Sequence, residues 1–243
     1  MATIDAKGLH FSALGEQLRD LAGHKVRIYN CLGQRYIAAG IKDITLDIDG
    51  IPGNALGAYL GEGSSITVRG NAQDATGDTM NGGSIIIHGS AGDAAGYAMR
   101  GGTILIRDDV GYRCGIHMKE FGDKIPKLCV GGRAGDFLGE YQAGGVICVL
   151  GLDCGENESP VGRFAGTGQH GGRIFIRTKL LPAELPPQVS YRTATAEDKA
   201  ILCPLLKAYA DAFGANYETL VQDTYLLLTP NSANPYESMY VQY

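Results

Sequence analysis

The sequence predicts an all-β core built as a right-handed parallel β-helix of about seven coils, with a small N-terminal α/β cap and a C-terminal helical extension. Two observations predict this fold: an apolar run that returns at a nearly fixed interval, and glycines that keep the same spacing. Short repeated units of this kind cannot bury their apolar faces alone, whereas identical units stacked on one another can. The predicted division is a cap over residues 1–42, a glycine-rich β-helix over 43–180 and an extension over 181–243.

The apolar run occurs seven times, and each occurrence is typical of one short strand. The successive steps are 20, 19, 19, 24, 19 and 27 residues, so two units carry insertions. Equivalent residues should stack about 4.8 Å apart as neighbours in a parallel sheet. Alternate side chains then fill the interior, and apolar ones on the outer side, such as Leu105, indicate a covering element or a partner protein. The runs are anchored at Leu46, Ile66, Ile85, Ile104, Leu128, Ile147 and Ile174.

The glycines mark a corner that is repeated in every unit. Thirty of the 36 glycines lie between Gly50 and Gly172. Glycine adopts positive φ without a steric penalty, so glycine in register predicts a sharp turn at the same place in each coil. One set falls eleven residues after the strand anchor, displaced in the last unit by its insertion, and a second set falls four residues earlier. These structural turn glycines are Gly53, Gly57, Gly77, Gly92, Gly96, Gly111, Gly115, Gly135, Gly139, Gly162 and Gly166.

Composition limits the classes of partner. The net charge is −5 and the sequence pI is about 5.5, and the basic residues are not clustered, which argues against nucleic acid. Because there is no run of about 18 apolar residues and no basic leader, we expect a cytoplasmic protein without a membrane partner. Six cysteines without Cys-x-x-Cys spacing fit a reducing compartment. Cys129 and Cys148 should stack on adjacent coils as small fillers.

The segments outside the repeats have mixed patterns. Residues 1–42 predict a short extended segment, an amphipathic helix that carries Leu14 and Leu18, and a strand near residues 25–29. After Arg177 comes a proline-rich strap, followed by a helix that begins at Thr195 and ends before Gly214. We expect the aromatic-rich tail to dock on the body or on a partner.

Candidate catalytic groups are few. Asp74, Asp93 and Asp136 recur at the position after the first corner glycine, which Gln73 replaces before Asp74. Stacked carboxylates of this kind could serve as general acid and base in a β-helical polysaccharide enzyme. They could equally accept hydrogen bonds from turn N–H groups, and their recurrence with the turn favours this structural interpretation.

Metal and phosphate sites are weakly indicated. Cys114, His117 and Cys154 could ligate a metal, as in an electron carrier, but the paired ligand spacing typical of structural zinc is missing. The stretch Gly131–Gly135 suggests a phosphate loop, yet no amphipathic helix follows it. We therefore assign no catalytic, cofactor-binding or metal-ligating residue.

The richest local sequence is residues 111–127, which contain a five-residue insertion. His117 could act as a general base or proton relay. However, loops on one face of a solenoid are commonly its binding surface, which favours a contact role. The candidate partner contacts are Tyr112, Arg113, His117, Lys119 and Glu120, together with Tyr236 and Tyr240 of the tail.

The ordered series of glycine motifs resembles one known family, the C-terminal β-helical domain of the glutamate synthase large subunit, called the GXGXG domain. The resemblance covers roughly Asn30 to Arg177 and is closest to versions that occur as separate polypeptides. Similar domains serve as the β-helical subunits of N-methylglutamate synthase and of formylmethanofuran dehydrogenase. The motifs that carry it are Gly53-Asn-Ala-Leu-Gly57, Gly70-Asn-Ala-Gln-Asp-Ala-Thr-Gly77, Gly89-Ser-Ala-Gly-Asp-Ala-Ala-Gly96, Gly135-Asp-Phe-Leu-Gly139 and Gly162-Arg-Phe-Ala-Gly166.

The resemblance implies a non-catalytic scaffold subunit of a glutamate-synthase-type complex in nitrogen metabolism. In that family one domain hydrolyses glutamine, ammonia passes through a tunnel, and an FMN-bearing barrel with an iron–sulfur cluster reduces the imine formed with 2-oxoglutarate. The expected partners are therefore an amidotransferase (glutaminase) subunit and an FMN-binding synthase subunit, with FMN and iron–sulfur clusters held by those partners. Ferredoxin and a nicotinamide nucleotide both remain open as electron donor.

Two alternatives remain open. The first is the equivalent β-helix subunit of N-methylglutamate synthase or formylmethanofuran dehydrogenase. The second, from another class, is a stand-alone carbohydrate-acting β-helix. Activity of the isolated chain would distinguish the second alternative from a scaffold.

Overall fold

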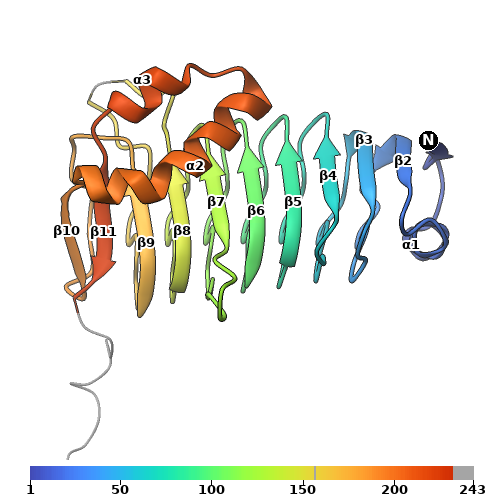
Figure 1. Ribbon diagram of the computed structural model, residues 1–243, viewed down its shortest axis with the longest axis horizontal. Coiled ribbons are helices and arrows are strands. Elements are labelled where there is room, and N and C mark those ends of the chain that lie inside the picture. Colours follow the sequence, from blue (N-terminus) through green and yellow to red (C-terminus); the bar gives the residue numbers. More distant parts are fainter. Residues whose placement is uncertain (156, 232–243) are drawn as a thin grey trace, which may run out of the picture.

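The computed structural model describes residues 1–155 and 157–231 and shows a parallel β-solenoid of about seven turns, which confirms the predicted fold class (Figure 1). The described strands form one sheet in the order β1-β2-β3-β4-β5-β6-β7-β8-β9-β11-β10. The stacked strands of the coils are β2 (Lys25–Leu32), β3 (Thr45–Ile51), β4 (Ser65–Val68), β5 (Asn81–Ile87), β6 (Gly101–Ile106), β7 (Lys127–Val130), β8 (Ala143–Val149) and β9 (Gly171–Ile176).

Neighbouring coils pair in parallel and in the predicted register. Ile66 pairs with Ile85, and Ile85 pairs with Ile104 in the next strand. These isoleucines have no exposed surface and form columns along the solenoid axis. Because each buried side chain contributes roughly 1.5–3 kcal/mol, the stacked columns supply the main stabilisation of the coils. One sequence repeat is therefore one coil.

The N-terminal segment continues the sheet. β1 (Ala2–Asp5) pairs in parallel with β2, and β2 pairs in parallel with β3. The helix α1 (Phe11–Asp20) buries Leu14 and Leu18 in the same core cluster as the coils. The hydrogen-bonded ladder thus begins at the first strand, and the predicted boundaries at residues 42 and 180 stay predictions.

Each coil turns through a seven-residue segment whose backbone alternates in handedness. In residues 74–80, Ala75, Gly77 and Thr79 have φ of 55°, 72° and 50°. The N–H groups of Ala75 and Thr79 donate to the following coil, whereas the Gly77 N–H donates 2.8 Å to the Leu56 carbonyl of the preceding coil. The alternation satisfies backbone groups in both directions. We call this surface the turn wall; it comprises residues 35–41, 54–60, 74–80, 93–99, 112–118, 136–142 and 163–169.

In six of the seven turns the central position is glycine because its α-carbon faces the interior; the turn over residues 35–41 has Ala38 there. A Cβ on Gly77 would lie 2.4 Å from Cδ1 of Ile104, and one on Gly115 would lie 2.4 Å from Cδ1 of Ile147. The flanking left-handed positions accept other residues, as Ala75 and Arg113 show. The glycines eleven residues after each anchor therefore mark the inner corner of the coil.

The outer face of β6–β9 is covered by the C-terminal extension of the same chain. The extension consists of β10 (Val189–Thr193), α2 (Ala196–Phe213), α3 (Tyr217–Gln222) and β11 (Leu226–Pro230), and α2 runs across the strands (Figure 1). Leu105, Cys129 and Cys148 pack in one cluster with Leu202 and Leu205 of α2. The sequence predicted that either another element of the chain or a partner protein covers this apolar face, and the structure shows an element of the chain, α2. Cys129 and Cys148 pair in register as buried free thiols, as predicted.

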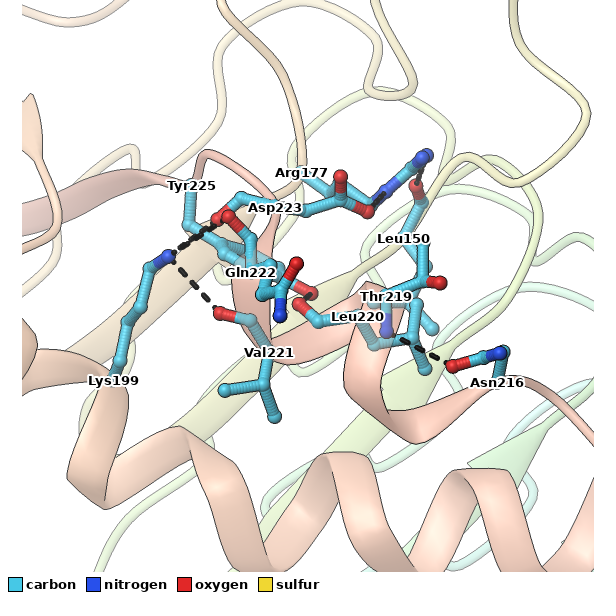
Figure 2. A network of polar contacts seen from close by, with 10 residues as sticks. All are labelled: Leu150, Arg177, Lys199, Asn216, Thr219, Leu220, Val221, Gln222, Asp223 and Tyr225. Atoms are coloured by element: carbon cyan, nitrogen blue, oxygen red, sulfur yellow. Dashed lines mark hydrogen bonds and ion pairs between the residues drawn. The ribbon is translucent and has the colours of Figure 1, made fainter.

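Polar contacts lock the extension to the last coils (Figure 2). Lys199 on α2 donates from Nζ to the carbonyls of Val221, at 3.1 Å, and Asp223. A cation at the C-terminal end of α3 is favourable because the last helical carbonyls carry partial negative charge. Arg177, which follows β9, pairs with Asp223 and donates 3.2 Å to the Leu150 carbonyl. This network joins α2, α3 and two coils.

The start of α2 is held by a second charged contact. Thr195 and Asp198 form a capping box, each side chain accepting from the backbone N–H of the other. Arg192 on β10 pairs with the same carboxylate. The Arg192 guanidinium beside Asp198 holds the pKa of that carboxyl well below its usual range, and the N–H and hydroxyl of Thr195 act in the same direction.

The inner-corner requirement can be tested by Gly77→Ala. We expect this variant to unfold more easily than Gly8→Ala, because Gly8 shares a positive φ of 69° but has open space at Cβ. Gly8→Ala should lose about 1–2 kcal/mol from backbone strain alone. Gly77→Ala should lose about 1–3 kcal/mol more from the clash with Ile104. Chemical denaturation of both variants measures the difference, and equal losses would contradict the interior placement.

The Asp198 contacts predict an acid dependence of stability. Because the folded pKa is lowered, this group stabilises the protein above its unfolded pKa of about 4, and the contribution is lost as pH falls toward the folded pKa. Asp198→Asn should therefore lower the free energy of unfolding near neutrality and differ less from wild type near about pH 3. Urea unfolding at both pH values measures this, and a difference that grows in acid would be the opposite result.

Candidate interaction wall

The recurrent aspartates of the turn wall serve the backbone of the next coil. Asp74 Oδ1 accepts the backbone N–H of Asp93 at 3.0 Å, and Asp93 Oδ1 accepts that of Tyr112 at 2.8 Å. Asp136 Oδ1 accepts the N–H of Arg163 at 2.8 Å. Each side chain thus caps the equivalent position one coil further on, which supports the structural interpretation of these carboxylates.

The same contact explains three glycines of the second set, Gly92, Gly111 and Gly162, whereas a Cβ on Gly53 or Gly135 would meet backbone atoms of the preceding coil. A Cβ on Gly92 would lie 2.1 Å from Oδ1 of Asp74, and one on Gly111 would lie 2.0 Å from Oδ1 of Asp93. Glycine at this position leaves room for the carboxylate of the preceding coil. Asn71, which follows Gly70, makes a similar contact to the Ser90 N–H at 3.0 Å, and the sequence did not predict it.

Side-chain rings stack along the C-terminal half of the turn wall. Phe137 stacks on Phe164 with ring centroids 5.1 Å apart, and the Arg113 guanidinium lies 4.8 Å from the Phe137 centroid. His117 stacks on Tyr141 at 5.0 Å. The spacing of the coils matches the spacing of stacked rings, so outward residues at equivalent positions contribute about 0.5–1.5 kcal/mol per pair. Sequence reasoning did not predict these ladders.

The structure places the predicted contacts of the fourth coil on this wall or directly after it. Tyr112 is 54% exposed, and His117 is also exposed. Arg113 pairs with Glu140 at 3.0 Å. Lys119 is exposed, and Glu120 accepts the N–H of Gly145 at 3.1 Å. Tyr236 and Tyr240 lie outside the described residues, and the contact role of all seven stays a prediction.

The insertion after Glu120 forms a small ordered hairpin. Phe121 and Lys124 exchange two backbone hydrogen bonds of 3.1 Å. Lys124 also forms an ion pair of 2.6 Å with Glu62, so the insertion reaches back along the solenoid. Phe121 is 72% exposed and Ile125 is 48% exposed. The hairpin thus holds two apolar side chains in solvent, which is typical of a protein contact.

The three residues considered as metal ligands do not form a site. Cys114 lies in the interior, where burial raises the pKa of its thiol to about 12. His117 is exposed, and its ring stacks on the Tyr141 ring rather than facing Cys114 in the interior. Across residues 1–155 and 157–231, no three His, Cys, Asp or Glu side chains are arranged to hold a metal ion.

A surface pocket of about 480 Å³ lies between the second insertion and the extension. Cys154, Glu158, Arg177, Lys179 and Asp223 are among the residues that line it. Glu158 pairs with Arg133, and Asp223 pairs with Arg177, so both carboxylates are engaged in ion pairs. The pocket therefore offers ion pairs rather than a poised acid and base.

Within the described residues, no helix has the length and apolarity needed to span a bilayer.

Comparison with known proteins gives two sequence relatives, which differ in how much of their own length the match covers. An uncharacterized protein of Methanocaldococcus jannaschii is 46% identical over 249 residues, covering 98% of this chain and 95% of that protein. Ferredoxin-dependent glutamate synthase 2 of Synechocystis sp. is 29% identical over 201 residues; the match covers 78% of this chain but only 12% of that protein.

A solved structure shares the fold. It is a chain of the formyltransferase/hydrolase complex from Methylorubrum extorquens in complex with methylofuran, with a TM-score of 0.59 and 20% identity, covering 92% of this chain and 90% of that one. The family model described as the GXGXG motif matches residues 23–229. Because this match includes the coils and most of the extension, the chain belongs to the GXGXG family.

Proposed function

We propose that the chain is a non-catalytic scaffold subunit of a glutamate-synthase-type complex. In this proposal an amidotransferase subunit releases ammonia from glutamine, and an FMN- and iron–sulfur-bearing subunit uses it for the reductive amination of 2-oxoglutarate. The observation that carries the proposal is the GXGXG solenoid itself, which resembles a segment of a glutamate synthase and uses its recurrent polar groups for coil-to-coil contacts.

The packing of the solenoid supports a bracing role. The interior of the described coils is filled by side chains with no exposed surface, such as Ile66, Ile104 and Ile147. A filled interior does not conduct a small molecule, so ammonia in such a complex would pass beside the solenoid, between the partner subunits. Parallel strands bonded coil to coil resist bending and hold attached subunits at a fixed separation.

The equivalent subunit of a formylmethanofuran-type complex is the second candidate. It is favoured by the structural match, which covers nine-tenths or more of both chains, whereas the glutamate synthase match covers 12% of that relative. The two candidates differ in the partners that they require. A flavin and iron–sulfur protein indicates the first, and a molybdenum or tungsten protein indicates the second.

The proposal predicts that the tagged chain, purified gently from its native cells, carries an amidotransferase and a flavin protein. The isolated chain should form no glutamate, whereas the complex should form it from glutamine and 2-oxoglutarate. Mass spectrometry identifies the partners, and the visible spectrum reports flavin and iron. A chain that elutes alone, or that acts on polysaccharide by itself, would contradict the proposal.

The predicted contact region can be tested by Tyr112→Ala combined with Phe121→Ser. Both side chains are more than half exposed, so folding should be unaffected, while association with the partners should weaken roughly tenfold or more. Leu32→Ser with Tyr191→Ala is the control, because these side chains are equally exposed but lie off this region. Retention of partners during size-exclusion chromatography measures the effect. Equal retention by both double variants would refute the contact role.

A further inference from the structure

A second part of the turn wall, over three earlier coils, also has the character of a binding surface. Tyr59 is 57% exposed and Tyr97 is 38% exposed. Tyr97 is held by an edge-on contact with the His117 ring, with centroids 5.8 Å apart. Large rings left in solvent but fixed in place are typical of protein interfaces, where tyrosine contributes contact area at a low entropic cost.

Three carboxylates lie on the second and third of these coils: Asp74 and Asp78 on the turn between those of the two tyrosines, and Asp93 on the turn of Tyr97. Asp74 and Asp93 accept only backbone N–H groups in the interactions described above, and Asp78 accepts the hydroxyl of Thr79 at 2.8 Å. None of the three forms an ion pair with a described residue. We call the surface formed by Tyr59, Asp74, Asp78, Asp93 and Tyr97 the acidic tyrosine patch.

The charges on the neighbouring sheet face are arranged differently. There Arg27 pairs with Asp49 at 2.9 Å, and Arg69 pairs with Asp47 at 2.9 Å. Those four charges are paired within the chain, whereas the three carboxylates of the patch are in none of the described ion pairs.

Lys42 and Lys124 line a hollow beside Tyr59. Lys124 pairs with Glu62, so the five residues of the patch keep three uncompensated negative charges. A complementary occupant supplies cations, and arginine suits the patch best because its guanidinium both pairs with carboxylates and stacks on tyrosine rings.

We propose that the acidic tyrosine patch binds an arginine- or lysine-bearing surface of a partner subunit. The inference rests on the proposed scaffold function and adds to it the place and the chemistry of one contact. Ala75 and Ala94, which are small and partly exposed on the same turns, let the backbone of the partner approach closely. Opposite charge then fixes the orientation of the partner and speeds its association.

The test removes the charge without removing the caps. The triple variant Asp74→Asn, Asp78→Asn and Asp93→Asn keeps a side-chain oxygen at each position, and Asn71 already performs such a cap. Its melting temperature should equal that of wild type. Glu16→Gln, Asp20→Asn and Glu218→Gln change the net charge equally at exposed positions away from the wall and form the control.

The measurement is retention of the native partner subunits by the tagged chain across a series of salt concentrations. We expect the triple variant to bind its partners roughly tenfold to a hundredfold more weakly at low salt. Its binding should also depend less on salt concentration, because the attraction that salt screens has been removed with the three charges. The control triple variant should match wild type. If the triple variant melts early, Tyr59→Ala, which removes an exposed ring, should still weaken binding.

The outcomes separate the two proposals. Unchanged retention and salt dependence in the triple variant, with wild type bound to its partners, would overturn the patch alone. Weakened retention in a complex that lacks an amidotransferase and a flavin protein would support the patch and overturn the glutamate-synthase assignment. A wild-type chain that binds no partner would overturn both.

Discussion

The hydrogen bonds of the turn wall constrain the rest of this structure. Alternating left-handed residues send successive N–H groups to opposite neighbours, so a coil is satisfied only when it lies between two others. Where the central residue is glycine it faces the core, and an added methyl group would meet an apolar side chain of a later coil, such as Ile104 at Gly77. The glycine at the inner corner thus allows close stacking at six of the seven turns, whereas the turn over residues 35–41 stacks with Ala38 at that place.

This constraint leaves the outward positions of the wall free to vary. The flanking left-handed residues range from Ala75 to Arg113 and Phe137, although non-glycine residues at positive φ carry a local cost. Stacked rings and backbone caps offset that cost where they occur, as between Phe137 and Phe164. Specific contacts can therefore change on this surface without altering the coil, which suits a scaffold.

The coils could be predicted from the sequence because equivalent residues of each coil recur at a nearly fixed spacing. Leu46, Ile66 and Ile85 stack in the structure as their spacing implied. The cover of Leu105 by α2 could not be predicted, since it depends on where a distant amphipathic helix docks. The ring ladders and the acidic tyrosine patch were also missed, because glycine spacing does not tell which flanking residues face solvent.

The two long faces of the solenoid differ in what they leave available to other proteins. α2 covers one half of the sheet face, where the Tyr209 hydroxyl also donates 3.1 Å to the Arg107 carbonyl. The other half pairs charges within the chain, as Arg69 does with Asp47. The turn wall carries several exposed rings, such as Tyr59 and Tyr112, next to carboxylates that take part in no described ion pair, such as Asp74 and Asp93. The cationic partner surface that we propose would therefore meet both carboxylates and aromatic rings on the turn wall. The stacked coils beneath it would hold that partner at a fixed position.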